Sequence, residues 1–265
     1  MNPGGLLVGL ALAIGVAVVA HRAHALSVSG SVAAALAGTL AVAAGWGWAI
    51  VLISYFAGSS LMSRYRAGDK EARSGGRTEK HGARDAIQVV ANGGAFSAFA
   101  LGYAVQPDPI WQTLAAGAIA ASAADTWATE VGVLARATPR SILTWKPVDV
   151  GTSGGITHQG VLGSAAGAAF VALTAVTVRW PSQAVFSALL GGIAGSLIDS
   201  VIGASLQSRR WCASCGSATE QRIHRCGTVT SRVGGIAWLD NDGVNAIATL
   251  GGALFGATTA RLFDA

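Results

Sequence analysis

Residues 111–136 read WQTLAAGAIAASAADTWATEVGVLAR, a long run of small and apolar side chains with a few polar ones in its second half. About 20 consecutive, mostly apolar residues are enough for a helix to cross the hydrocarbon core of a membrane. Comparable segments occupy residues 5–20, 26–44, 46–61, 86–105, 159–178, 184–206 and 236–260. The sequence therefore predicts an all-α fold, a single polytopic transmembrane helical bundle of seven or eight spans that covers residues 1–265.

The overall composition excludes a soluble enzyme. Only 12% of the 265 residues are charged, whereas about 25% is usual in soluble domains. Hydrophobic residues make up 52% of the chain, and the mean hydropathy is +0.50. The net charge of +5 fits basic loops at a membrane surface. We therefore expect the lipid bilayer as a partner, and no nucleic acid.

The basic residues predict an orientation. Of the 18 Lys and Arg residues, all but Arg179 and Arg261 fall on one side when eight spans are threaded through a membrane. Loops rich in Lys and Arg usually stay in the cytoplasm. This rule predicts that residues 62–85, 137–158 and 207–235 are cytoplasmic loops of a protein in the inner membrane of a bacterium or archaeon, with the N-terminus outside.

Polar side chains share one face of the segment at 111–136, within an arc of about 140° on a helical wheel. They are Ser122, Asp125, Thr126, Thr129 and Glu130. The segment at 184–206 repeats the pattern around Asp199. Ionisable residues inside spans are costly and usually functional. The alternative, that these groups only tie helices together by hydrogen bonds, stays open.

Further polar groups mark the fourth and last spans. Asp85, Gln88 and Asn92 line one face of the fourth span from its start, and Asp242, Asn245 and Thr249 repeat this spacing in the last span, just after Asp240. Converging carboxylates repel one another unless cations lie among them. Mg²⁺ prefers such oxygen ligands and usually completes its shell with phosphate oxygens and water, so we expect a phosphate-bearing substrate. The candidate catalytic residues are Asp125, Glu130, Asp199, Asp240 and Asp242, with Mg²⁺ held by Asp125 and Asp199.

A Gly-rich turn precedes the sixth span. Residues 151–157 read GTSGGIT, and a turn of this kind at the start of a helix presents free backbone N–H groups to an anion. The plainer interpretation is an ordinary loop with Thr157 as the helix cap. Arginines before the fourth span could also contact phosphate. The candidate nucleotide- and phosphate-binding residues are Arg77, Lys80, Arg84, Asp85, Asn92, Gly151, Thr152, Ser153, Gly154, Gly155 and Asn245.

The three cysteines and one histidine lie close together in the sequence. Cys212, Cys215, His224 and Cys226 follow the spacing C-x2-C-x8-H-x-C. Three thiolates and one imidazole are the ligand set of a structural zinc site. We therefore expect a small zinc-knuckle-like cytoplasmic loop, with a Cys212–Cys215 disulfide as the alternative, which a cytoplasmic location disfavours.

Four stretches together resemble a family of integral membrane proteins long described as a domain of unknown function. They are GARDAIQVVANG at 82–93, ADTWATEVG at 124–132, GTSGGIT at 151–157, and the cysteine cluster that leads to WLDNDGVN at 238–245. The best-understood member of that family is the plant phytyl-phosphate kinase of the vitamin E pathway. The segments at 124–132 and 151–155 are also similar to elements of the CTP-dependent dolichol and phytol kinases, although Ala124 and Gly155 replace a Gly and a Glu of those enzymes.

The resemblance implies a membrane-bound kinase. Such an enzyme transfers the γ-phosphoryl group of CTP or another nucleoside triphosphate to phytyl or geranylgeranyl phosphate, with its active site on the cytoplasmic face. Two other classes remain open. A cation-coupled transporter would also place aspartates inside its spans, and a non-catalytic scaffold would leave the buried carboxylates without a role.

Overall fold

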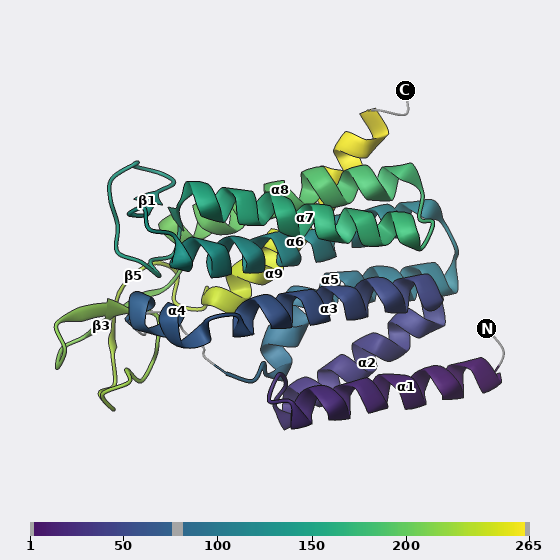
Figure 1. Cartoon of the computed structure of the whole chain (residues 1–265), viewed down its shortest axis with the longest axis horizontal. Helices are drawn as coiled ribbons and strands as arrows, with labels where there is room; N and C mark the ends of the chain where they lie inside the picture. Colours follow the sequence, from purple (N-terminus) through teal and green to yellow (C-terminus); the bar gives the residue numbers. More distant parts are fainter. Residues whose placement is uncertain (1–2, 76–81, 263–265) are drawn as a thin grey trace.

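The computed structural model describes residues 3–75 and 82–262, and helices dominate it (Figure 1). The helices are α1 (Pro3–Arg22), α2 (Val28–Ala44), α3 (Trp46–Arg64), α4 (Ala67–Ser74), α5 (Ala86–Val105), α6 (Pro109–Leu134), α7 (His158–Thr177), α8 (Ser182–Ser205) and α9 (Asn241–Leu262). All of these except the short α4 coincide closely with the apolar segments read from the sequence. The mainly helical fold is therefore confirmed.

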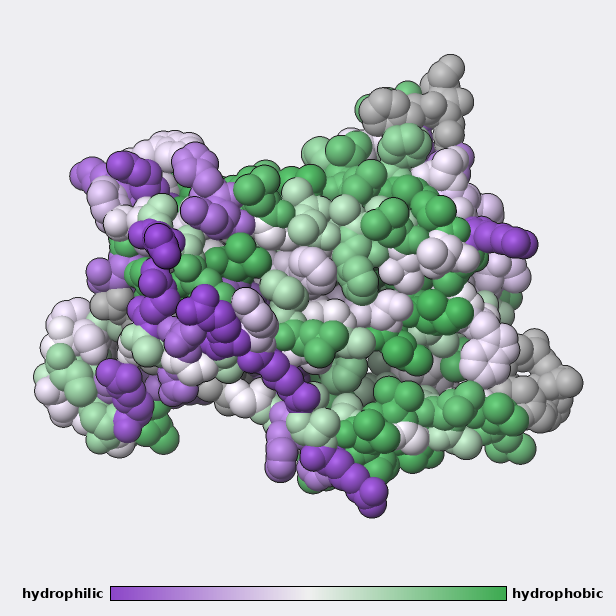
Figure 2. Space-filling view, viewed as in Figure 1, coloured by the Kyte–Doolittle hydropathy of each residue, from purple (hydrophilic) through white to green (hydrophobic). Residues whose placement is uncertain are grey.

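The outer surface of the bundle is apolar. Leu36 is 63% exposed, Leu162 70% and Leu173 66%, and Figure 2 shows many hydrophobic residues on the face of the bundle in view. A surface of this kind is unfavourable in water and favourable against lipid. By length and composition, α3, α7 and α8 are each able to cross a membrane, and the apolar stretches in α1 and α2 are shorter. The total of seven or eight spans stays a prediction.

Helix α6 lies in the middle of the bundle, where it packs against α3, α5, α7, α8 and α9. Its side chains from Ala115 to Ala124 are at most 2% exposed. Small residues make the close packing possible, because a Cβ atom at Gly191 of α8 would lie 2.3 Å from the carbonyl oxygen of Gly252 in α9. Since other helices surround α6, it can carry acidic residues without turning them toward lipid.

An aromatic cluster closes one end of the bundle. The ring centroid of Trp48 in α3 lies 5.4 Å from that of Phe96 in α5 and 4.9 Å from that of Trp180, which follows α7. Trp48 is 2% exposed and Phe96 is fully buried. Aromatic pairs at such distances add to the stability that burial provides. The cluster therefore holds α3 and α5 together far from the polar end.

The polar loops gather at the other end, on the left of Figures 1 and 2. Successive long helices alternate in direction, so the loops after α1, α3, α6 and α8 all reach this end. Among the described Lys and Arg residues, Arg179 after α7 and Arg261 near the end of α9 are the exceptions. The loops predicted to be cytoplasmic therefore share one end of the molecule.

In the described part of the chain, two small sheets stiffen these loops, which the all-helical expectation did not include. Antiparallel strands β1 (Arg140–Ser141) and β2 (Gly155–Ile156) pair within the loop between α6 and α7. Strands β3 (Arg209–Cys212), β4 (Ser217–Thr219) and β5 (Ser231–Gly234) form a sheet in the order β4-β3-β5 before α9. The short helix α4 was also not anticipated. These elements position loop residues over the ends of the long helices.

Candidate active site

A cavity of about 620 Å³ lies at the polar end of the bundle, between α3, α4, α5, α6, α8 and the loop before α7. Its lining includes most of the candidates chosen from the sequence. They are Arg84, Asn92, Asp125, Glu130, Gly151, Thr152, Ser153, Gly154, Gly155, Asp199 and Asn245. Segments far apart in the chain thus meet around one space.

Asp125 of α6 and Asp199 of α8 lie next to each other on the wall of this cavity. Their carboxyl groups are close enough to share a hydrogen bond. The Oδ2 atom of Asp199 is buried and has no hydrogen-bond partner among the described residues. Two adjacent carboxylates are stable together when they share a proton or bind a cation. The pair therefore has the donor atoms and the electrostatic demand of a divalent-cation site.

Glu130, about one and a half turns further along α6, forms an ion pair at the cavity wall. Lys70 Nζ of α4 lies 2.5 Å from a carboxylate oxygen of Glu130 and also donates to the carbonyl oxygens of Met62 (2.7 Å) and Ser63 (2.9 Å). Lys70 is 7% exposed. Glu130 therefore meets a cation from its own chain, which the grouping of Glu130 with the other carboxylates did not anticipate.

The Gly-rich turn at 151–155 packs directly on α8. Gly154 has φ +74°, and a Cβ atom there would lie 2.4 Å from Ala204 Cβ and 2.5 Å from the carbonyl oxygen of Ser200. A side chain at this position would be strained by the backbone and would also collide with the helix. Ser153 Oγ donates a hydrogen bond to the carboxylate of Glu220, a residue near Asp199. The turn is thus held against the aspartate pair.

The alternative assignment of Thr157 as a helix cap is confirmed. Thr157 Oγ1 accepts a hydrogen bond of 3.0 Å from the backbone N–H of Gly160 at the start of α7. Thr157 can cap α7 while the preceding turn faces the cavity, because the cap uses the side chain of Thr157 and not residues 151–155.

Arg84 and Asn92 line the side of the cavity formed by α5 and the segment before it. The guanidinium of Arg84 donates to Ser60 Oγ (2.9 Å) and Ser63 Oγ (3.4 Å) of α3. Asn92 Oδ1 accepts a 2.7 Å hydrogen bond from Ser122 Oγ, which also lies 2.7 Å from the hydroxyl of Tyr55. A buried polar chain therefore joins α3, α5 and α6 below the aspartate pair.

Three predicted carboxylates do not line the cavity. Asp85 caps α5 by accepting from Gln88 N–H at 2.9 Å, and Asp240 accepts from Gly243 N–H at 3.1 Å before the first turn of α9. Asp242 is 5% exposed and also lies outside the cavity lining. A capping carboxylate points toward the backbone N–H groups at the start of its own helix. Polar residues that share one face of a helix in the sequence therefore do not all reach the cavity. Arg77 and Lys80 lie outside the described residues.

Sequence reasoning missed Tyr55, Lys70 and Glu220 as cavity residues. Tyr55 stands beside Ser54 in a mainly apolar span and gave no local signal. Lys70 stands in a loop crowded with other basic residues, and the burial that distinguishes it depends on α4 folding back onto α6.

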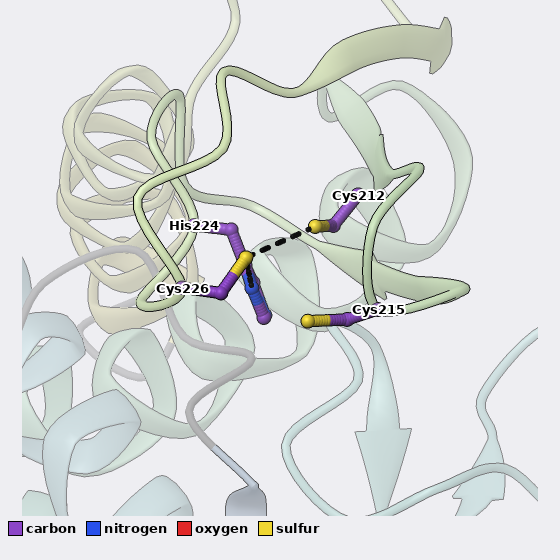
Figure 3. Close-up of side chains that lie close together, drawn as sticks. All are labelled: Cys212, Cys215, His224 and Cys226. Atoms are coloured by element: carbon purple, nitrogen blue, oxygen red, sulfur yellow. Dashed lines mark hydrogen bonds between the residues drawn. The ribbon is translucent and has the colours of Figure 1, made fainter.

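The four side chains of the cysteine cluster converge, as Figure 3 shows. One ligand atom from each of Cys212, Cys215, His224 and Cys226 lies within 4.8 Å of the others. The sulfur atoms of Cys212 and Cys226 are 3.6 Å apart, and His224 Nδ1 is 3.1 Å from the Cys226 sulfur. Two sulfur atoms bound tetrahedrally to one zinc ion would be about 3.8 Å apart. The cluster therefore fits a metal ion in both composition and spacing.

The thiols of this cluster are not joined in the alternative Cys212–Cys215 disulfide, because all three cysteines are free. Hydrogen bonds with Thr228 and then with His224 lower the pKa of Cys226 to about 5. A hydrogen bond with Cys226 is the largest cause that raises the pKa of Cys215, to about 11. With a pKa of about 5, Cys226 is a thiolate near neutral pH. A thiolate can bind a metal ion without first losing a proton. Glu220 lies between Cys215 and His224, so the cluster restrains the segment that brings Glu220 to the cavity.

A helical bundle with a lipid-compatible surface and an internal polar cavity at one end is an integral membrane protein. Residues 11–253 match the family model of the integral membrane protein DUF92, and the chain belongs to this family. The resemblance found in the sequence is therefore confirmed at the level of the family.

Relatives come from plants, archaea and cyanobacteria. Protein PGR of Arabidopsis thaliana is 30% identical over 256 residues, which is 87% of each chain. An uncharacterised membrane protein of Methanocaldococcus jannaschii is 30% identical over 72% of this chain and 75% of its own. One of Synechocystis is 35% identical over 63% of this chain and 66% of its own. The search of solved structures found no match.

Proposed function

We propose that this protein is a membrane-bound prenyl-phosphate kinase. It transfers the γ-phosphoryl group of CTP or another nucleoside triphosphate to a prenyl monophosphate, such as phytyl or geranylgeranyl phosphate, and releases the diphosphate at the cytoplasmic face. The observation that carries the proposal is the meeting of the Asp125–Asp199 pair, the turn at 151–155 and the basic residues around one cavity. Carboxylates beside phosphate-binding groups are the components that phosphoryl transfer requires.

Asp125 and Asp199 would hold Mg²⁺, because their oxygens are hard donors and Asp199 Oδ2 has no hydrogen-bond partner among the described residues. When bound, Mg²⁺ neutralises charge on the phosphates of the nucleotide. The sequence predicted that five carboxylates would converge, whereas the proposed cation site consists of these two. Glu130 is assigned instead to holding Lys70 at the cavity wall.

The anionic groups of the substrates would meet the backbone N–H groups at 151–155 and the basic side chains of Arg64 and Arg84, which all line the cavity. Preorganised donors of this kind stabilise charge that spreads over the transferring group. The acceptor is itself a phosphate anion, so its oxygen attacks without first losing a proton to a strong base. The chain's own part in catalysis is therefore positioning and charge neutralisation.

The depth of the aspartates favours a kinase over the alternative cation-coupled transporter. Asp125 lies nine residues before the end of α6 and Asp199 six residues before the end of α8, or about 14 Å and about 9 Å at the rise of a helix. Carriers usually bind their cargo near the membrane midplane. Both carboxylates lie in the half of their helix that is nearer the basic loops, which better suits an enzyme that draws a nucleotide from one side.

The cysteine cluster would bind zinc as a structural cofactor. Its ligand set and spacing fit zinc, and the loop around it carries Glu220 and leads into α9. Zinc bound there would stabilise the 207–235 loop rather than take part in transfer.

A direct assay tests the proposed activity. Purified protein in detergent is incubated with Mg²⁺, geranylgeranyl phosphate and each of the four nucleoside triphosphates, and the diphosphate is measured by mass spectrometry. Asp125→Asn should be inactive, whereas Asp108→Asn, a change at an exposed cap at the opposite end of α6, should match the wild type. Absence of diphosphate with every nucleotide, together with cation-driven transport in proteoliposomes, would favour the transporter.

A further inference from the structure

A second cavity adjoins the first one. It has a volume of about 350 Å³, lies between α1, α2, α3 and α5, and is lined mainly by apolar residues. We call it the apolar groove and define it by Leu12, Val16, Gly38, Ile53, Phe56 and Gly93. Four polar residues, Tyr55, Arg84, Gln88 and Asn92, line both the apolar groove and the polar cavity. The two spaces therefore meet at one boundary.

The groove has room for a ligand beside Gly93. This glycine is buried, yet a Cβ atom built on it would have no atom of residues 3–75 and 82–262 within 4 Å, its own surroundings in the helix apart. Packed protein interiors leave few voids of this kind. Along α3 the lining runs from Trp46 to Phe56, a length of about 15 Å at the rise of a helix. The groove is thus long and narrow.

Arg84 is fixed at the boundary between the two spaces. Its backbone N–H donates to Ala25 O at 3.0 Å and its carbonyl accepts from Ser27 N–H at 3.0 Å, so the segment before α5 is tied to the loop between α1 and α2. Its guanidinium lies 5.8 Å from the ring centroid of Phe56, a residue of the groove. A fixed cation at the mouth of an apolar groove is complementary to an amphiphile with an anionic head.

We propose that the apolar groove binds the hydrocarbon tail of the prenyl monophosphate, while the phosphate group passes Arg84 into the polar cavity. This inference rests on the proposed function and assigns a place to the acceptor. An extended chain advances about 1.2 Å per bond, so about 15 Å holds roughly three isoprene units. The distal end of a longer tail extends past Trp46 into the lipid.

Gly93→Leu tests the groove, because the new side chain fills space without meeting a neighbour at its Cβ. Gly15→Leu in α1 is the matched control, since Gly15 is exposed, its Cβ position is equally open and it does not line the groove. The kcat/KM ratio of geranylgeranyl phosphate to dimethylallyl phosphate is measured for each protein. Gly93→Leu should lower this ratio about tenfold or more, because the long tail loses buried apolar contacts. Gly15→Leu should keep the ratio of the wild type.

Photolabelling gives a readout that does not depend on turnover. A farnesyl phosphate analogue with a diazirine at the distal end of its tail should label peptides from α1, α2, α3 or α5, and both excess farnesyl phosphate and Gly93→Leu should reduce the label. An unchanged kcat/KM ratio in Gly93→Leu would overturn the groove while leaving the kinase intact. If the wild type transfers no phosphate, the proposed function fails, and competed labelling alone decides whether the groove binds a prenyl tail. Labelling that farnesyl phosphate does not displace would assign the groove to bulk lipid and overturn the inference.

Discussion

Lys70 and Glu130 form an ion pair of 2.5 Å that joins the short helix α4 to the central helix α6 at the wall of the polar cavity. The side chains are 9% and 20% exposed. Because the pair is buried to this degree, it holds the loop after α3 against α6. The position of this loop in turn shapes the cavity. Two carbonyl oxygens at the end of α3 complete the coordination of the ammonium group.

Loss of one partner of this pair should cost more stability than loss of both. Lys70→Met leaves the Glu130 carboxylate without its cation, which costs about 3–5 kcal/mol when such a pair is buried and less at this partial exposure. Lys70→Met with Glu130→Gln should recover part of that loss. Thermal unfolding of the two single variants and the double variant in detergent measures the coupling. Additive effects would show that the two residues do not interact.

Asp125→Asn and Asp199→Asn should each abolish phosphoryl transfer while expression and thermal stability stay near those of the wild type. Each change removes a charge that the cation requires and keeps the shape of the side chain. Kinase assays over a range of Mg²⁺ concentrations check this prediction. A fully active double variant would remove the aspartate pair from the mechanism.

Gly154→Ala should weaken nucleotide binding and lower the unfolding temperature. The new methyl group would meet Ala204 and Ser200 and would also sit at a positive φ. Gly75→Ala is the control, because Gly75 also has a positive φ (+62°) but none of the described residues has an atom within 4 Å of its Cβ position. Backbone strain alone costs about 1–2 kcal/mol. Equal destabilisation by the two variants would mean that the contact with α8 contributes nothing.

The cysteine cluster should hold about one zinc ion per chain. Cys212→Ser with Cys215→Ser should remove it and make the segment between β3 and α9 sensitive to protease, because metal binding orders such loops. Metal analysis of protein prepared without chelators, and limited proteolysis before and after chelation, measure both effects. Ser214→Ala, beside the ligands, should keep the metal.

The polar end of the bundle should face the cytoplasm. A cysteine at the exposed Ala72 in α4 should resist a membrane-impermeant thiol reagent in intact cells and react after the membrane is opened, whereas one at the exposed Gln106, at the opposite end of the bundle, should react from outside. The unsubstituted protein gives the background from Cys215 and Cys226, which are also exposed. If the Ala72→Cys variant were labelled from outside, the polar end would face away from the cytoplasm. The cavity would then have no access to nucleotide, and the transporter would be the better proposal.

The helical segments and the one-sided basic loops could be read from the sequence because they are local properties. Runs of apolar residues match the thickness of a membrane, and the alternation of helix direction then brings Arg22, Arg64, Arg140 and Arg209 to the same end. The positions of Asp125 and Asp199 on their helices were equally visible, because an acidic residue in an apolar span stands out. The ligand set of the cysteine cluster followed from spacing alone.

The tertiary structure decided which polar groups actually meet. Asp240 was grouped with Asp125 as a candidate catalytic carboxylate, yet it caps α9, while Lys70 is one of several loop cations until α4 packs against α6. In addition, no single segment of the sequence indicates that the two cavities meet at Tyr55 and Arg84. Helix rotation and the approach of distant segments set these contacts, and both depend on the packing of small residues between helices. The sequence therefore determined the long helices and the chemistry of their side chains, and the packing determined the site.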